Sequence, residues 1–354
     1  MMMMSVCRCI DLFRLRTPLK LMSRWSSYNV MNPGGQGTSY GDVQRGNQTF
    51  CGNAKDEILK IVENLISKPH LENEPFTVAE YGAADGSISM EFMTDIIRNI
   101  PNARSYLLDH ENVYVTSART SFYEQCFPSN SVDLALSFTA TQWLSKPVYP
   151  NYTLDAASKL AADDWTLFLK NRTKELKPGG LGVFSTLGGR DATPGEPVCI
   201  AFQDGLNEVG KIWNDLFDRG VITKSDLDKG TIAICFRSPC ELKQPINDSK
   251  ELMNMGLKVK VKSDAIPCFY VTEWKQKLEQ GSNDWDSFAR GMTKYLKIPA
   301  YNTFCGALGS ERSEEQKSQI FESVFEGMEK WFLSKYPGDM NPYCFYTSTY
   351  VQKE

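Results

Sequence analysis

The segment from Thr77 to Gly86 combines the acid Glu80 with two glycines at a spacing that suits a ligand-binding turn. A short apolar run ends in Glu80, and Gly82 belongs to a turn of small residues that leads to a helical pattern from Met90. This order predicts a strand, a tight turn and a helix. Glycines let the backbone approach a ligand closely, and the first turn of a helix carries N–H groups without intrahelical partners.

The spacing of the glycines separates two classes of cofactor. A nicotinamide dinucleotide would need Gly-x-Gly-x-x-Gly at this turn, whereas Gly82 and Gly86 form Gly-x-x-x-Gly. The carboxylate of Glu80 would repel a pyrophosphate, but it suits a cofactor with a cationic amino-acid end, such as S-adenosylmethionine. An ordinary strand-to-helix turn without a ligand is the alternative interpretation, and a nicotinamide-dependent oxidoreductase ranks last.

The composition narrows the classes of partner. The chain has 354 residues, of which 42% are hydrophobic and 23% charged, as in a globular protein with a large core. A formal net charge of −4 gives no electrostatic reason to expect nucleic acid or an anionic membrane. No apolar run approaches the roughly 18 residues of a membrane span, so we predict no membrane partner.

Metal-ligating residues are sparse along the chain. There are two histidines, His70 and His110, and the ten cysteines form no Cys-x-x-Cys pair; only Cys7 and Cys9 are close in sequence. A zinc site would need closely spaced ligands of these types, so we predict no metal. The cysteines are best interpreted as reduced residues of an intracellular protein.

Residues 1–27 differ from the rest of the chain. Against one acid, they carry five basic residues: Arg8, Arg14, Arg16, Lys20 and Arg24. This composition is typical of a mitochondrial targeting segment, whereas the four leading methionines favour an extension without that role. We expect residues 1–27 to lie outside the fold and the protein to be cytoplasmic, with a mitochondrial location as the alternative.

Strand and helix patterns alternate through the remaining chain. Strands are predicted, after the one ending at Glu80, at 131–138, 181–187, 257–261, 265–271 and 343–352. Helices are predicted at 56–68, from Met90, and at 163–177, 202–219, 285–296 and 313–334. This alternation predicts a parallel sheet with helices on both faces, and the helices without a strand partner predict a cap over the carboxyl edge of the sheet.

Four segments resemble the salicylic acid/benzoic acid/theobromine (SABATH) carboxyl methyltransferases. They are, in the order of that family, Gly34–Tyr40, Ala79–Gly86, Ser121–Ser131 and Ser137–Ser145. The continuous stretch from Ser121 to Ser145 is the most specific. The resemblance implies an α/β fold, a Rossmann-like class I methyltransferase sheet with a helical cap. It also implies a core at residues 28–190, a cap at 191–335 interleaved with core strands near 257–271, and a last core strand within 336–354.

The resemblance implies S-adenosyl-L-methionine as the cofactor. Glu80, Gly82 and Gly86 would frame its methionine end. Ser121 would bind the adenine by a hydrogen bond, and Phe122 would stack on it. Tyr40 and Gln44 would close the site from the N-terminal side.

The resemblance also implies a small-molecule carboxylic acid as substrate and O-methylation to its methyl ester. Trp143 would donate to the carboxylate, with Asn47 or Gln48 as a second donor. Thr139 stands where the family has a pocket tyrosine, and Pro33 where it has a lysine, so the acid must be held differently. A carboxylate is ionised at neutral pH and needs mainly orientation to attack a methyl group, so we predict no catalytic acid or base. A homodimer is left open.

One departure from the family concerns the second strand. Normally this strand ends in an acid that binds the ribose hydroxyls, but about 34 residues separate Gly86 from Ser121. Residues 104–115 must then serve as connection and third strand together, with Asp109 or Glu111 as substitute acid. We therefore expect the second strand region to be shortened and one position of the sheet to be empty or irregular. The alternative function is a catalytically weak or inactive relative that acts as a binding protein.

Overall fold

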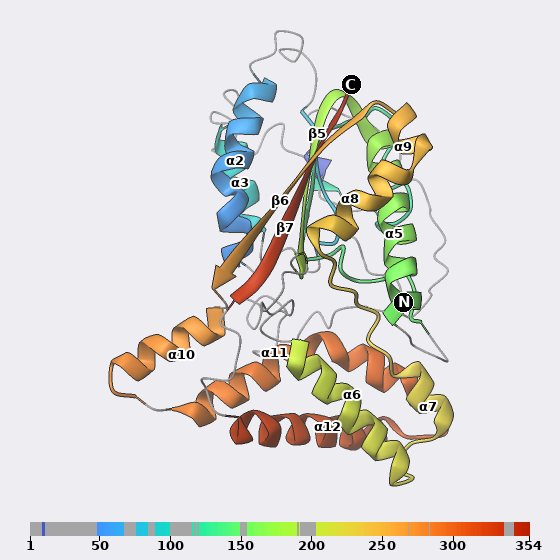
Figure 1. Ribbon diagram of the computed structural model, residues 1–354, viewed down its shortest axis with the longest axis vertical. Coiled ribbons are helices and arrows are strands. Elements are labelled where there is room, and N and C mark those ends of the chain that lie inside the picture. The colour runs from blue at the N-terminus through green and yellow to red at the C-terminus, as the bar shows by residue number, and fades with distance from the viewer. Residues whose placement is uncertain are drawn as a thin grey trace.

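The computed structural model of the protein describes most of the chain beyond residue 47 and a short N-terminal piece (Figure 1). The described residues are 9–10, 48–66, 76–83, 89–99, 115–116, 118, 120–148, 154–189, 191, 203–267, 269–282, 284–335 and 343–354.

Within the described residues, seven strands form one sheet in the order β3-β1-β2-β4-β5-β7-β6. Their bounds are β1 Cys9–Ile10, β2 Val78–Glu80, β3 Val115–Thr116, β4 Val132–Phe138, β5 Leu176–Gly188, β6 Leu257–Pro267 and β7 Tyr343–Lys353. Strands β2, β4 and β5 are parallel, whereas β7 runs antiparallel to both β5 and β6. Strand β3 lies on one side of β2, beyond β1, and β4 and β5 lie on the other side, so the strand order reverses at β2. Open α/β sheets bind ligands outside the carboxyl ends of the strands at such a reversal.

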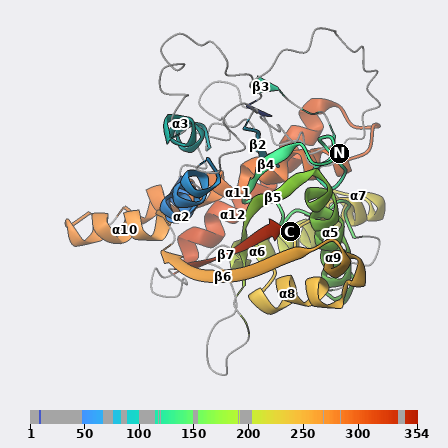
Figure 2. The same cartoon turned by 90° about the horizontal axis from the view of Figure 1, so that it is seen from above.

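Two helical layers cover the two faces of the sheet, and a third closes one end (Figures 1 and 2). Helices α2 (Gln48–Ile66) and α3 (Met90–Asn99) pack on one face around a core with Leu134 and Leu136 of β4. Helices α5 (Leu154–Glu175), α8 (Pro239–Asp248) and α9 (Lys250–Asn254) pack on the other, with Trp165 and Phe168 in that core.

The cap lies below the carboxyl end of β5 in Figure 1. It contains α6 (Gln203–Asp218), α7 (Lys224–Lys229), α10 (Phe269–Glu279), α11 (Trp285–Ala307) and α12 (Glu314–Ser334). Its core is rich in aromatic rings and reaches Leu187 of β5 and Tyr346 of β7. Helices α8 and α9, within the range expected for the cap, pack beside α5 instead.

Local sequence signals explain where several elements begin and end. Thr223, Ser238 and Ser313 precede α7, α8 and α12 and form capping boxes with the third helical residue. Strand β4 is buried on both faces, and apolar residues make up most of it, as expected for an inner strand of a parallel sheet. The edge strand β6 carries exposed lysines, which discourage pairing with another chain.

Most of the predicted elements are confirmed. The helices predicted at 202–219 and 313–334 and the strands at 131–138 and 343–352 agree to within one residue at each end. Helices α2, α5 and α11 are longer than predicted. The strand predicted at 265–271 is wrong at its end, because β6 runs unbroken to Pro267 and Phe269 begins α10.

The second position of the sheet corrects two sequence predictions. Cys9 pairs antiparallel with Ala79 of β2 and with Thr116 of β3, so β1 fills the place expected to be empty or taken by residues 105–115. The expectation that all of residues 1–27 lie outside the fold is therefore wrong for Cys9 and Ile10. The position is irregular, as expected, since its strand has two residues and runs antiparallel.

Candidate functional site

Glu80 lies at the carboxyl end of β2, at the reversal of strand order. Glu80 is buried, with 3% of its surface exposed, and its Oε2 accepts a hydrogen bond of 2.7 Å from the Ser89 hydroxyl. Ser89 immediately precedes α3, so this bond ties the end of the strand to the start of the next helix. A buried carboxylate held this way could face the cationic end of a ligand.

Gly82 is required in the turn for two structural reasons. Its φ of +76° is unfavourable for residues with a Cβ, and a Cβ built there would lie 2.3 Å from the Ala140 Cβ and 3.7 Å from Phe122 Cδ1. The turn therefore packs directly on the residue that follows Thr139 at the end of β4. A larger side chain at Gly82 would therefore collide with Ala140 and disturb the fold of the turn, whether or not a ligand is bound.

The last turn of α5 holds the loop 121–127 beside the turn. Arg172 and Glu175 are both fully buried, and their side chains form a bidentate ion pair with N–O distances of 2.8 and 2.9 Å. Arg172 also donates to the carbonyls of Phe122 and Glu124, and Glu175 accepts from the amides of Cys126 and Phe127. The Tyr81 hydroxyl donates to Glu175 at 2.6 Å, which links the loop to the end of β2.

The clamp made by Arg172 and Glu175 changes the pKa of Arg172. Burial alone would lower the pKa of Arg172, but Tyr81 and Glu175 raise it above its ordinary value. The guanidinium also lies 3.9 Å from the centre of the Tyr81 ring. The clamp was not predicted from the sequence. An Arg-x-x-Glu spacing, which places both side chains on one helix face, was the available signal.

Ser121 and Phe122 lie next to each other but in different surroundings. Ser121 is partly exposed, and its Oγ accepts a hydrogen bond of 3.3 Å from the Tyr123 amide. The Phe122 ring is fully buried and contacts the Tyr123 ring at a centroid distance of 4.5 Å. The stacking of adenine on Phe122 stays a prediction, and this burial in the core does not favour it.

Thr139 and Trp143 flank a tight turn at the carboxyl end of β4. Thr139 has a φ of +50°, and Gln142 donates to its carbonyl at 2.7 Å while accepting from Thr186 at 3.0 Å. Trp143 is 6% exposed, and its carbonyl accepts from the hydroxyl of Tyr123. The Tyr123 ring thereby joins the loop 121–127 to the segment predicted to contact the substrate.

Several predicted site residues cannot be placed. Tyr40, Gln44, Asn47, Gly86, Asp109 and Glu111 lie outside the described residues, and of Gln48 only its place as the first residue of α2 is described. Of the predicted residues, the structure brings Gly82 close to Phe122, with Glu80 two residues before Gly82 and Ser121 beside Phe122 in the chain.

The described part of the chain contains neither a membrane-spanning helix nor a cluster of metal ligands. None of the described helices is long and apolar enough to cross a membrane. Within the same residues, no group of three or more His, Cys, Asp or Glu side chains is arranged to hold a metal ion.

The fold is that of a known class of enzyme. A solved structure described as loganic acid methyltransferase with SAH matches 92% of this chain and 99% of its own, with a TM-score of 0.66 and 17% sequence identity. At this identity the match shows the fold, a Rossmann-like methyltransferase sheet with a cap.

Sequence comparisons identify the relatives more closely. The family model described as SAM dependent carboxyl methyltransferase matches residues 149–295. Salicylate carboxymethyltransferase of Clarkia breweri is 28% identical over 54% of this chain and 55% of its own length. Gibberellic acid methyltransferase 1 of Arabidopsis thaliana is 24% identical over 58% and 60%, respectively. The chain is thus similar to the SABATH-type carboxyl methyltransferases, and it spans somewhat more than half the length of these two.

Proposed function

We propose that the protein is an S-adenosylmethionine-dependent O-methyltransferase that converts a small-molecule carboxylic acid to its methyl ester. The observation that carries the proposal is the geometry at the end of β2. The buried carboxylate of Glu80 and the positive-φ turn at Gly82 lie at the reversal of strand order, beside the clamped loop 121–127. Relatives named for methylating salicylate and gibberellic acid support the same chemistry.

Each residue would have a simple task. Glu80, Gly82 and Gly86 would frame the amino-acid end of the cofactor, and Ser121 would donate its hydroxyl to the adenine, since that oxygen accepts from the Tyr123 amide. Tyr40, Gln44, Asp109 and Phe122 complete the proposed cofactor set. Bound S-adenosylmethionine would supply an electrophilic methyl group on sulfur.

Holding the acid would be the task of residues around the turn after β4. Trp143 can only donate through its indole N–H, and Asn47 or Gln48 would provide a second donor. Thr139, with its backbone bent by Gln142, would shape the wall between them. Orientation and the exclusion of water by the cap would provide most of the rate enhancement, because an ionised carboxylate needs no base.

Binding and turnover should be tested separately. Calorimetry with S-adenosylhomocysteine measures cofactor binding, and a methyl-transfer assay with salicylate, benzoate and gibberellic acid measures activity. We expect micromolar binding and ester formation from at least one acid. Each acid should also bind more tightly than its own methyl ester, because donors arranged for an anion lose a charge-assisted partner in the ester. Equal affinity of acid and ester would contradict the carboxylate assignment.

A catalytically weak relative that acts as a binding protein is the second candidate. It is favoured by β1, which fills the second position of the sheet with two residues of the extension rather than with a strand that ends in a ribose-binding acid. Absence of S-adenosylhomocysteine binding, together with retained binding of a carboxylic acid, would support this candidate over the first.

The remaining features of the proposal concern partners and location. We propose a cytoplasmic protein whose partner is a small acid rather than nucleic acid or a membrane, in keeping with the formal net charge of −4. A mitochondrial location and a homodimer are the alternatives, and fractionation and sedimentation would test them.

A further inference from the structure

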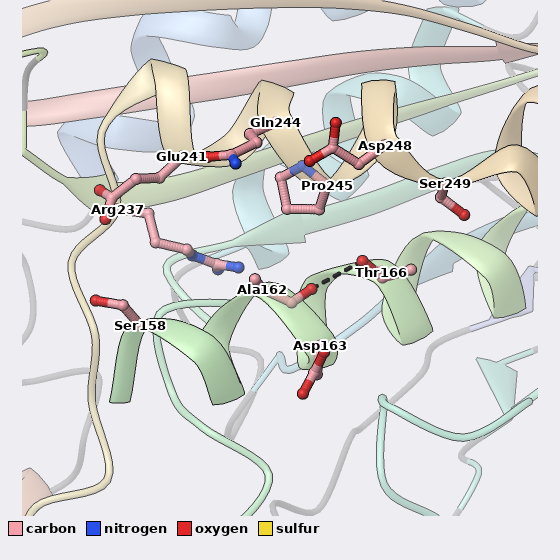
Figure 3. A pocket seen from close by; sticks show the side chains of 10 residues that line it. All are labelled: Ser158, Ala162, Asp163, Thr166, Arg237, Glu241, Gln244, Pro245, Asp248 and Ser249. Atoms are coloured by element: carbon pink, nitrogen blue, oxygen red, sulfur yellow. Dashed lines mark hydrogen bonds between the residues drawn. The ribbon is translucent and has the colours of Figure 1, made fainter. Parts of the chain in front are cut away.

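A groove separates α5 from α8 on the face of the sheet opposite α2 and α3 (Figure 3). Its volume is about 400 Å³, within the size range of small-molecule sites. The lining is mostly polar, and only Ala162 and Pro245 are apolar. The lining residues are Ser158, Ala162, Asp163, Thr166, Arg237, Glu241, Gln244, Pro245, Asp248 and Ser249. A groove of this character suits a polar ligand.

Arg237 is the unusual member of the lining. Its side chain reaches between the two helices toward Ala162, and the residue is 3% exposed (Figure 3). Its terminal nitrogens donate to the carbonyls of Ala161, at 3.2 Å, and Thr141. Its Nε has no hydrogen-bond partner, and no carboxylate among the described residues forms an ion pair with it.

The neighbours of the Arg237 guanidinium are two carbonyl oxygens and, at 5.2 Å, the centre of the Trp165 ring, so none of them carries a full negative charge. Burial lowers the pKa of Arg237, and the charges of Asp164 and Glu241, which form no direct ion pair with it, offset this effect only in part. Buried cations in folded proteins are normally paired with an anion. An acceptor at this end of the groove would therefore be stabilising.

The opposite charge lines the rest of the groove. Asp163, Glu241 and Asp248 are exposed, and Glu241 is used by the capping box of α8. Asp248 is the last residue of α8, where the negative end of the helix dipole disfavours a carboxylate. Its position is therefore not explained by the stability of the helix. A simple anion would be repelled by these acids, and a simple cation would leave Arg237 without an acceptor.

We propose that this groove binds a small zwitterion of the amino-acid class. The carboxylate of the ligand lies toward Arg237, and its ammonium group pairs with Asp248, with Asp163 adding to the attraction. The hydroxyls of Ser158 and Thr166 and the amide of Gln244 provide polar walls between the two charges. The site is separate from the turn at Gly82 and independent of the methyltransferase proposal.

Three probes with the same four-carbon chain test the proposal. γ-Aminobutyrate carries both charges, butyrate only the negative one and n-butylamine only the positive one. A ligand of the native state raises the melting temperature of the full chain. We expect stabilisation, and binding by calorimetry, with γ-aminobutyrate alone. Glycine, run in parallel, reports how far apart the two charges must be.

Matched variants locate the binding. Asp248→Asn should weaken γ-aminobutyrate binding about tenfold, because a charge-assisted hydrogen bond is lost. Asp218→Asn is the control, since Asp218 is likewise the exposed last residue of a helix, α6, but lies outside the groove. It should leave binding unchanged.

The proposal has clear ways to fail. Arg237→Lys keeps a buried cation but loses the Nε donor, and it should weaken γ-aminobutyrate binding while the protein stays folded by circular dichroism. Equal stabilisation by n-butylamine would mean that only the acids of the groove bind the ligand, and it would overturn the proposal. So would absence of γ-aminobutyrate binding at millimolar concentration, or unchanged binding in Asp248→Asn.

Discussion

The two ends of the sheet are built differently. Strands β4, β5, β6 and β7 have 7, 13, 11 and 11 residues, whereas β1, β2 and β3 have 2, 3 and 2. At the long end, β7 pairs along most of β5 and all of β6. At the short end the proposed cofactor turn follows a strand of three residues.

The difference indicates that the proposed cofactor side depends on side-chain anchors. Asp133 of β4 accepts from the Thr77 amide just before β2, at 2.8 Å, and from Lys177 at 2.9 Å. Glu175 fixes both Tyr81 and the loop 121–127. These anchors all belong to elements at the long end. The short end should therefore lose its order first when an anchor is removed, and the long end last.

The largest effect is expected from Glu175→Gln. The change removes the buried partner of Arg172 and weakens the bonds to two amides and a hydroxyl, so we expect a loss of about 3–5 kcal/mol in the free energy of unfolding. Urea denaturation would measure it. The control is Glu322→Gln, which breaks the exposed pair with Lys297 and should cost less than about 1 kcal/mol. Similar losses in the two variants would contradict the role of the clamp.

Gly82→Ala should have the next largest effect, about 2–4 kcal/mol, from the sum of a strained φ and a contact with Ala140. Gly220→Ala isolates the first part, since Gly220 has a φ of +72° and an added methyl group there would meet nothing within 4 Å. Adding Ala140→Gly to the Gly82 variant should restore part of the stability. If Gly82→Ala and Gly220→Ala cost the same in urea denaturation, the turn does not pack as described.

The long end of the sheet and the turn after β2 were predictable because they follow local rules. The mostly apolar run of β4 and the acid-glycine pattern after β2 are each contained in one short stretch of sequence. The pairing of Cys9 with Ala79 was not predictable, because it joins residues far apart in the chain through backbone atoms that carry no sequence signal. The groove at Arg237 was not predicted for a similar reason, because it forms only where α5 and α8 lie side by side.

Asp226 allows a test in the cap, through pH. Burial opposes its charge, but hydrogen bonds from Thr223 and the charge of Arg312, at 2.8 Å, hold the pKa of Asp226 below its ordinary value. Its stabilising contribution is therefore present above the unfolded pKa of about 3.9 and is lost as pH falls through the folded value. Asp226→Asn should cost about 2 kcal/mol at pH 7 and flatten the acid side of the stability curve. An unchanged acid slope in urea titrations would contradict this assignment.

Removal of residues 1–27 should have the smallest effect on global stability. Each backbone hydrogen bond that β1 makes contributes a net of about 1 kcal/mol, but ordering each of its two residues costs a similar amount, so the two terms nearly cancel. The effect should instead be local. Amide exchange should accelerate in β2 and β3, which lose their neighbour, and stay slow in β6 and β7. Ile10→Pro keeps the extension but removes a backbone donor and should reproduce the same local pattern. Unchanged exchange in β2 and β3 would mean that β1 does not protect them, and a large global loss would mean that the extension supports more of the fold than this one pairing.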